Sequence, residues 1–177
     1  DMKPFCTFKS IKLYKTKNYS LNSIQDQNKI KKFDYNIIFV LGWQRLIPKW
    51  LIDSAEYGAI GGHGSPYGIN LGRGRSPQNW SIMLREQFFF MALFKINEGA
   101  DDGPVLIEEK IEYNQFDDIS TSYKKTSLLV SDMYMKIINQ PEILNHSKSQ
   151  NTEPFYFPQR IPSDGIVDWN LSQLQIH

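Results

Sequence analysis

Cysteine is almost absent from this chain of 177 residues, in which Cys6 stands alone. A single cysteine cannot form an internal disulfide, so the fold has to be stabilised by its packed core. Histidine is nearly as scarce, because the chain contains only His63, His146 and His177. No histidine has a companion at the spacing of metal ligands, and we therefore expect neither a zinc site nor any other metal.

An excess of charge of one sign is also missing. Twenty Lys and Arg residues stand against nineteen Asp and Glu residues, which leaves a formal net charge of +1. Affinity for nucleic acid comes largely from the release of counterions by many basic side chains. The balance of charges therefore argues against a protein that coats RNA. A local basic patch is compatible with this net charge.

Long hydrophobic runs are absent as well. No run approaches the roughly 18 apolar residues that a helix needs to cross a bilayer. The opening residues "DMKPFCTFKSIKLYK" lack the apolar centre of a signal peptide. We therefore expect a cytoplasmic protein with no membrane partner.

What the chain does contain is the composition of a globular domain, with 41% hydrophobic and 22% charged residues. The length suits one domain with a real core. Apolar runs at 35–43 ("YNIIFVLGW") and 58–62 ("GAIGG") predict buried strands. A short helix with Pro48 near its first turn is predicted between them. Strand, helix and strand in this order indicate a right-handed crossover and an α/β sheet.

Two further elements are predicted before the first buried strand. The residues 9–15 ("KSIKLYK") read as a short strand or an extended entry to the domain. Spaced apolar residues over about 21–33, with Ser20 as N-cap, predict a helix.

The second half of the chain continues the alternation. Ser76 followed by Pro77 predicts the start of a helix. Apolar runs at 88–96 and 104–113 predict two strands joined by the acidic, glycine-containing loop "NEGADDG". A long helix capped by Asp118 or Ser120 is predicted to run to about Asn139.

A stretch with six glycines, "AIGGHGSPYGINLGRGRSPQNW" at 59–80, surrounds His63. Fixing the backbone of a glycine costs more conformational entropy than fixing that of other residues. A glycine-rich stretch therefore indicates tight turns or a close approach of the backbone to a ligand. Ligands of open α/β sheets bind beyond the carboxyl ends of the strands. We expect a strand at Ala59–Gly61 and His63 just past its end. The alternative is a surface loop that holds an incidental histidine.

His63 and the Asp101–Asp102 dipeptide are the residues that could perform chemistry together. A histidine can stabilise an oxyanion while a carboxylate accepts the proton that an attacking amine loses. The two segments are far apart in sequence and "DDG" is a common turn, so spacing alone does not establish the pair.

Four ordered motifs give the chain a resemblance to a known family. The segment from Asn36 to Trp169 resembles the formyl-tetrahydrofolate-dependent formyltransferases, whose pattern is matched here in order. The residues that match the four motifs are Gly42, Trp43, Ile47 and Pro48; His63 and Ser65; Arg73, Gly74 and Pro77; and Asp101, Gly103, Val105 and Leu106. The tail "FPQRIPSDGIVDW" also resembles a segment of that family.

The resemblance implies an α/β fold with a Rossmann-like, open, twisted, mostly parallel sheet and helices on both faces. Residues 1–169 would form the catalytic domain, with its N-terminal part missing. Residues 170–177 would begin a truncated C-terminal segment. Formyl-tetrahydrofolate would be the co-substrate, and no metal would take part.

The resemblance also implies roles for individual residues. His63 would steady the tetrahedral intermediate, and Asp101 would orient the imidazole and accept the amine proton. The pterin of the folate would be bordered by Leu46, Ile47, Pro48, Glu98, Gly99, Ala100 and Asp102. The acceptor would be contacted by Ser65, Arg73, Gly74 and Asn79. For Asp102, a solvated turn carboxylate is the simpler interpretation.

Two departures from the family pattern matter for activity. The family usually has an asparagine two residues before the histidine, and this chain has Gly61 there. Loss of one oxyanion donor can cost about a hundredfold in rate. Asn70 or Asn79 could substitute for it. The residues "SPYGIN" lengthen the spacing from His63 to Arg73, as a small insertion would.

The function expected on this basis is transfer of a formyl group to a primary amine. The "RGRSPQN" loop most resembles members that formylate nucleotide-linked amino sugars for surface polysaccharide. Initiator methionyl-tRNA is the second acceptor considered, and glycinamide ribonucleotide the third. Hydrolysis with water as acceptor, and a folate-binding relative with little turnover, are the alternatives. Small molecules are the expected partners, and the sequence is also compatible with a homodimer.

Overall fold

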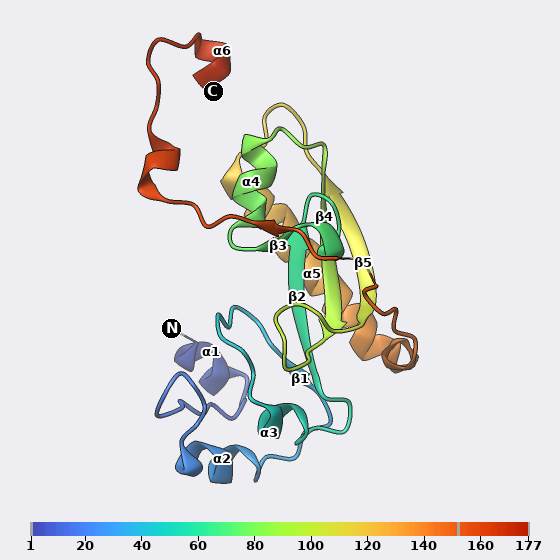
Figure 1. The fold of residues 1–177 in the computed structure, drawn as a ribbon. Coiled ribbons are helices and arrows are strands. Elements are labelled where there is room, and N and C mark those ends of the chain that lie inside the picture. Colours follow the sequence, from blue (N-terminus) through green and yellow to red (C-terminus); the bar gives the residue numbers. More distant parts are fainter. Residues whose placement is uncertain (1, 152, 177) are drawn as a thin grey trace. The chain divides into compact units, whose positions relative to one another are not determined.

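The computed structural model describes residues 2–151 and 153–176. The chain divides into two compact units. The first unit comprises Asp1–Gly61 and Lys95–Asp102, and the second comprises Gly62–Phe94 and Gly103–His177. Figure 1 shows the helices and strands of both units.

The first unit contains three short helices and a short strand. These are α1 (Lys3–Phe8), α2 (Ile24–Ile30), β1 (Ile38–Phe39) and α3 (Lys49–Ile52). α3 follows Pro48 as predicted. No strand forms at 9–15 within the described part of the chain, where the residues take irregular structure.

The helix expected over 21–33 is shorter than predicted, and the N-cap assigned to Ser20 is wrong. Leu21 has a φ of 58°, in the left-handed region, which excludes it from a right-handed helix. α2 begins only after Ser23, whose side chain accepts a hydrogen bond from the backbone N–H of Asp26. This bond satisfies a donor of the first turn, as an N-cap does.

Asp26 organises the chain before α2. Its carboxylate is fully buried and accepts hydrogen bonds from the Tyr14 hydroxyl (2.6 Å) and the Lys17 backbone N–H (2.9 Å). The bond from Tyr14, with help from the backbone donors, lowers the pKa of Asp26 below its ordinary value of 3.8. The ionised carboxylate therefore holds the segment 14–18 against α2.

The sheet has four strands in the order β1-β2-β4-β5. β2 (Ala59–Ser65) pairs with β1 in parallel, with Ile38 opposite Ala59. β4 (Phe88–Lys95) and β5 (Val105–Glu112) form an antiparallel pair. The predicted parallel neighbours and the later strand pair are confirmed, and the sheet mixes parallel and antiparallel pairing in an α/β arrangement.

The second unit is built around one long helix, α5 (Ile119–Asn139), which contacts β5 and the short helix α4 (Pro77–Met83) (Figure 1). α5 begins at Asp118, whose side chain accepts from the Thr121 N–H in a capping box. Two 3₁₀ turns, at Ile69–Leu71 and Pro141–Asn145, lie before the C-terminal segment of this unit. Its core is formed by fully buried side chains: Phe89, Leu93, Met133 and Ile137.

A second, two-stranded sheet was not predicted. β3 (Arg73–Gly74) pairs in parallel with β6 (Tyr156–Phe157). The Phe157 ring stacks on Tyr67 at 6.1 Å and on Trp80 at 5.9 Å between ring centroids. The cluster ties the chain after residue 153 to α4 and to the turn that follows β2.

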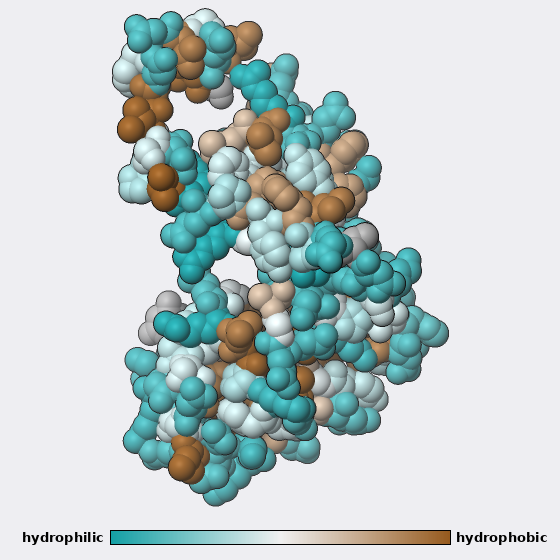
Figure 2. Space-filling model, in the orientation of Figure 1, coloured by the Kyte–Doolittle hydropathy of each residue, from teal (hydrophilic) through white to brown (hydrophobic). Residues whose placement is uncertain are grey.

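The C-terminal segment carries a 3₁₀ turn, Pro162–Gly165, and the short helix α6 (Gln173–Ile176). Figure 2 shows hydrophobic residues on the surface of this segment. Ile166, Trp169 and Leu174 are each about four-fifths exposed. Over the described residues, no helix combines the length and apolar character needed to cross a membrane.

Candidate functional site

His63 lies inside β2 and not past its end, so the predicted position at the strand terminus is wrong. β2 continues four residues beyond Gly61, to Ser65. A Cβ on Gly64 would lie 2.4 Å from Met91 Sδ and from Phe89 Cε1, and one on Gly62 would lie 3.1 Å from Leu93 Cδ2. These glycines let β4 side chains pack onto the β2 backbone, which is why a glycine-dense stretch is a strand here.

The packing of Gly62 and Gly64 also orients His63. Successive side chains of a strand point to opposite faces of the sheet. The His63 side chain therefore projects from the face opposite to the one that Phe89 and Met91 cover. It is half-buried there, and its contact with a ligand stays a prediction.

Ser65, predicted to contact the acceptor, is fully buried at the end of β2. Its hydroxyl accepts a hydrogen bond from the Tyr67 N–H at 3.1 Å. A Cβ on Gly72 would collide with Ser65 Oγ at 1.7 Å, so the hydroxyl occupies the space that a side chain would need. Ser65 stabilises the turn after β2, and its contact with the acceptor stays a prediction.

Arg73 and Gly74 form β3, and both are fixed by the segment that includes β6. Arg73 Nη2 donates to Oε1 of Gln150 at 2.7 Å, and Nη1 donates to the Tyr156 hydroxyl at 3.5 Å. Gly74 has a φ of 105°, and a Cβ there would lie 2.7 Å from the Phe157 carbonyl oxygen. The sequence reasoning missed Gln150 and Tyr156, because a polar segment distant in the chain carries no pattern that links it to Arg73.

The two asparagines considered as substitutes at Gly61 differ in their surroundings. Asn79 lies in α4 and its Oδ1 accepts a hydrogen bond from Arg160 Nη1 at 3.4 Å. Asn70 Oδ1 is buried and has no hydrogen-bond partner among the described residues. Asn79 is therefore already engaged, and its role with the acceptor stays a prediction.

The predicted pterin border at Leu46, Ile47 and Pro48 lies in the first unit. Ile47 is buried in a core cluster with Leu21 and Leu51. Leu46 is 62% exposed, and Pro48 is the N-cap of α3. Of these three side chains, Leu46 is the one most open to a ligand, because Ile47 is committed to the core.

The loop between β4 and β5 contains the other predicted donor-site residues. Glu98, Gly99, Ala100 and Asp102 are exposed. The Asp102 carboxylate lies over Gly99, where a Cβ would come within 2.1 Å of Oδ2. A side chain at position 99 would therefore require the exposed Asp102 carboxylate to move.

Asp101 is half-buried and has a φ of 54°, in the left-handed region. Asp and Asn enter that region more readily than most residues. Strained backbone of this kind clusters at active sites and ligand-binding sites.

The two predicted catalytic residues belong to different units, His63 to the second and Asp101 to the first. Their meeting stays a prediction. If they meet, an imidazole and a carboxylate provide what acyl transfer to an amine requires, namely an oxyanion stabiliser and a proton acceptor. Among the residues that the structure describes, no group of three or more His, Cys, Asp or Glu could hold a metal ion.

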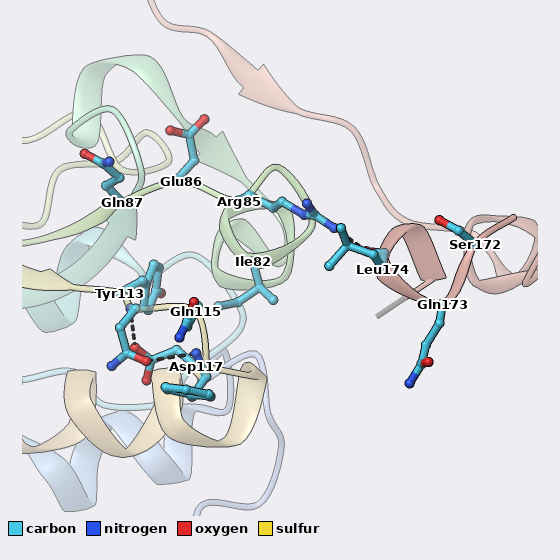
Figure 3. Close-up of a pocket in the computed structure, with 12 residues that line it drawn as sticks. Ile82, Arg85, Glu86, Gln87, Tyr113, Gln115, Asp117, Ser172, Gln173 and Leu174 are labelled. Atoms are coloured by element: carbon cyan, nitrogen blue, oxygen red, sulfur yellow. Dashed lines mark hydrogen bonds between the residues drawn. The ribbon is translucent and has the colours of Figure 1, made fainter.

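The second unit also has a hollow of about 1200 Å³ that holds none of the predicted site residues. Figure 3 shows it between the end of α4, the turn after β5 and α6, with Arg85 directed at α6. Its carboxylates are already engaged: Glu86 accepts from the Tyr67 hydroxyl, and Asp117 pairs with Lys125 at 2.6 Å.

No model of a known protein family matches the chain. Its sequence is 27% identical to the methionyl-tRNA formyltransferase of Prochlorococcus marinus (strain AS9601), a match that includes 99% of the chain and 55% of that protein. It is 30% identical to the enzyme of the same name from Wolbachia pipientis subsp. Culex pipiens, over 86% of the chain and 48% of that protein. The chain thus spans about half the length of the curated relatives it matches.

Solved structures agree in fold. The methionyl-tRNA formyltransferase of Clostridium thermocellum superposes with a TM-score of 0.67 at 18% identity, covering 98% of this chain and 73% of that one. The N-formyltransferase of Helicobacter canadensis, in complex with folinic acid and dTDP-3-aminofucose, gives 0.68 at 17% identity over 98% and 60%. WlaRD, a sugar 3N-formyltransferase in the presence of dTDP and 5-N-formyl-THF, gives 0.68 at 17% identity over 99% and 60%.

These likenesses show that the chain has the fold that formyltransferases share. Its relatives in sequence and its neighbours in structure are formyltransferases, as for an N-terminal domain of the formyl-tetrahydrofolate-dependent formyltransferase family.

Proposed function

We propose that the protein transfers the formyl group of formyl-tetrahydrofolate to a primary amine. The observation that carries the proposal is that methionyl-tRNA formyltransferases match 99% of the chain, including the segments that hold His63 and Asp101. The shared fold with a sugar 3N-formyltransferase crystallised with 5-N-formyl-THF supports the choice of donor.

In the proposed mechanism the amine nitrogen attacks the formyl carbon and forms a tetrahedral intermediate. The formyl oxygen gains negative charge, which His63 stabilises. The nitrogen loses a proton to Asp101, directly or through one water. Collapse of the intermediate breaks the bond to the folate nitrogen, which takes up a proton, and releases a formamide and tetrahydrofolate.

The donor would lie against Leu46 and the loop residues 98–102. Support comes from exposure, because Leu46 and most of the loop residues are open to solvent while Ile47 is in the core. We further propose a Rossmann-like sheet with helices on both faces, a catalytic domain over 1–169 and a location in the cytoplasm. Gly61 lacks the amide that the family usually has, so a folate-binding relative with weak turnover is the competing interpretation.

For the acceptor, we propose the amino group of a nucleotide-linked sugar, on the basis of the "RGRSPQN" loop. The structure with dTDP-3-aminofucose supports this class. Methionyl-tRNA is the second candidate, because the relatives in sequence carry that name. The near-neutral charge of the chain weighs against RNA.

The proposal is tested by measuring release of tetrahydrofolate from formyl-tetrahydrofolate in the presence of each acceptor. We expect turnover with nucleotide-linked amino sugars and none with the corresponding hydroxyl sugars, which lack the amine. Turnover with methionyl-tRNA alone would support the second acceptor. Folate binding without amine-dependent turnover would contradict catalysis and favour the weak relative.

A further inference from the structure

The basic residues of the chain are distributed very unevenly. Residues 2–33 contain eight lysines, no arginine and one acidic residue, whereas residues 34–177 contain 12 basic and 17 acidic residues. The near-neutral net charge therefore conceals a strongly positive segment, which lies entirely in the first unit. A concentration of one sign of charge favours a partner of the opposite sign.

The one acidic residue of this segment does not reach its surface. Asp26 is fully buried, and its carboxylate accepts hydrogen bonds from the Tyr14 hydroxyl at 2.6 Å and from the Lys17 N–H at 2.9 Å. All eight lysines, in contrast, are exposed: Lys3, Lys9, Lys12, Lys15, Lys17, Lys29, Lys31 and Lys32. The surface of the segment is therefore positively charged.

Large apolar side chains lie exposed among the first of these lysines. Phe8 is 80% exposed, and four others are each half exposed or more: Met2, Phe5, Ile11 and Leu13. Phe5 and Phe8 are three residues apart in α1 and so share a face of the helix, while Cys6 is buried. The Lys9 Nζ lies 5.1 Å from the centre of the Phe8 ring, so charge and apolar surface are adjacent. Single exposed apolar residues are ordinary, whereas several close together mark an interaction surface.

The backbone that carries these side chains is ordered by a Schellman motif at the end of α1. The Ile11 N–H donates to the Cys6 carbonyl at 2.8 Å, and the Ser10 N–H donates to the Thr7 carbonyl at 3.2 Å. Ser10 has a φ of 55°, the left-handed conformation that this motif requires. The turn ties Ile11 to α1 (Figure 1), so the apolar residues before and after it belong to one ordered segment.

The composition of this segment favours lipid over nucleic acid. Surfaces that bind single-stranded nucleic acid stack the bases on aromatic rings and use arginine as well as lysine. Residues 2–17 contain no arginine, and Met2, Ile11 and Leu13 have no ring on which a base could stack. The interface of an anionic bilayer attracts lysine and accepts both aliphatic and aromatic side chains.

We propose that residues 2–17 form a basic and apolar surface that binds an anionic lipid bilayer. The lysines are attracted by the headgroups, while Phe5, Phe8, Ile11 and Leu13 enter the boundary between headgroups and acyl chains. The sequence led us to expect no membrane partner, because no run is long enough to cross a bilayer. A surface that lies on a bilayer needs no such run, and this binding is independent of the proposed formyl transfer.

The first experiment measures how much of the protein floats with vesicles in a density gradient. One set of vesicles contains phosphatidylglycerol and phosphatidylcholine in equal parts, and the other contains phosphatidylcholine alone. We expect binding to the anionic vesicles only, and release by added salt, which screens exposed charges. No binding to the anionic vesicles, or equal binding to both sets, would overturn the proposal.

Two triple variants of equal net charge locate the surface. The combination of Lys9→Gln, Lys12→Gln and Lys15→Gln should weaken binding to the anionic vesicles at least about tenfold, because each lysine near an anionic surface adds to the affinity. The matched control removes three exposed lysines of the second unit by Lys110→Gln, Lys124→Gln and Lys148→Gln, and should leave binding unchanged. Equal loss in the two variants would show a general effect of net charge and overturn the proposal.

A pair of phenylalanine variants tests the apolar part of the surface. Phe8→Ser should weaken binding several-fold, whereas Phe116→Ser should not, although Phe116 is 82% exposed in the second unit. Both side chains are exposed, so circular dichroism should show an intact fold. Unchanged binding in Phe8→Ser would contradict insertion into the interface.

A nucleic-acid arm distinguishes the other polyanion. The fluorescence anisotropy of labelled polyuridylate is measured with the unchanged protein at the ionic strength of the flotation experiment. We expect binding to the polyuridylate to be weaker than binding to the anionic vesicles. Binding of polyuridylate that depends on Lys9, Lys12 and Lys15, without binding to vesicles, would overturn the proposal in favour of RNA.

Discussion

His63 is the residue whose substitution separates chemistry from binding. We expect His63→Ala to lower kcat at least about a hundredfold, because it removes a group that stabilises charge only in the transition state. The dissociation constant for formyl-tetrahydrofolate should change no more than a few-fold. Steady-state kinetics and a folate titration measure both quantities.

His146 provides the matched control for that substitution, since it is exposed at the end of the second 3₁₀ turn. His146→Ala should keep full activity. Equal activity in His63→Ala and His146→Ala would reduce His63 to a structural residue of β2.

Asp101 and Asp102 are adjacent carboxylates for which opposite outcomes are expected. Asp101→Asn keeps the shape and suits a left-handed backbone, so the protein should fold while kcat drops steeply through loss of the proton acceptor. Asp102→Asn should leave kcat within a few-fold, because that side chain lies over Gly99 in an exposed turn. Circular dichroism and turnover of both variants check this, and the reverse order of effects would contradict the assignment.

At the level of residues, the sequence pointed to chemically suitable side chains but misplaced one of them. His63 was expected beyond a strand end, yet it lies within β2, since Phe89 and Met91 pack over Gly64. Ile47, expected beside the pterin, lies in a core cluster, and its contact with the pterin stays a prediction. Whether a side chain faces a ligand or the core depends on its packing partners in the folded protein. A local sequence pattern does not identify those partners.

β2 is an element whose glycines are required by a neighbouring strand. Gly64→Ala should destabilise the protein by about 1–3 kcal/mol, the usual cost of overpacking, because the new methyl group meets Phe89 and Met91. Gly165→Ala is the control, since nothing lies within 4 Å of a Cβ at that position. Denaturant unfolding measures both, and similar free energies of unfolding for the two variants would show that β4 does not pack on Gly64 as described.

Elements with a long or strongly apolar pattern were predictable, and short ones were not. The strands β4 and β5 and the helix α5 with its Asp118 cap match the prediction, and β1 and β2 form where strands were predicted but with different ends. β3 and β6 have two residues each, too few to show any period. The start of α2 was not predicted correctly because Leu21 takes a left-handed conformation, which a leucine does not lead one to expect.

The stability of the whole molecule should depend on pH through Asp26. Its folded-state pKa is lowered by the Tyr14 hydrogen bond, so its contribution is present above the unfolded-state pKa and is lost as pH falls through the folded value. The difference in free energy of unfolding between the unchanged protein and Asp26→Asn should therefore be largest near neutral pH and shrink below pH 3.8. Urea titrations from neutral to acidic pH measure it, and a difference independent of pH would contradict this role.

Contacts between segments that are distant in the sequence could not be predicted from it. His63 and Asp101 lie in different compact units of the chain, and Gln150 reaches Arg73 from far along the sequence. Contacts of this kind depend on the tertiary structure, whereas a sequence motif shows only which residues are present. The proposed chemistry therefore depends on a test of the reaction itself.

The most direct test follows the formyl group in a single turnover. The protein, in excess, is mixed with formyl-tetrahydrofolate labelled in the formyl carbon and with a nucleotide-linked amino sugar, and the products are separated. The account predicts that the label appears in the amide of the sugar nucleotide, in an amount that matches the tetrahydrofolate released, and that Asp101→Asn slows its appearance. Label that stays on the folate, or that leaves as formate, would contradict formyl transfer to an amine.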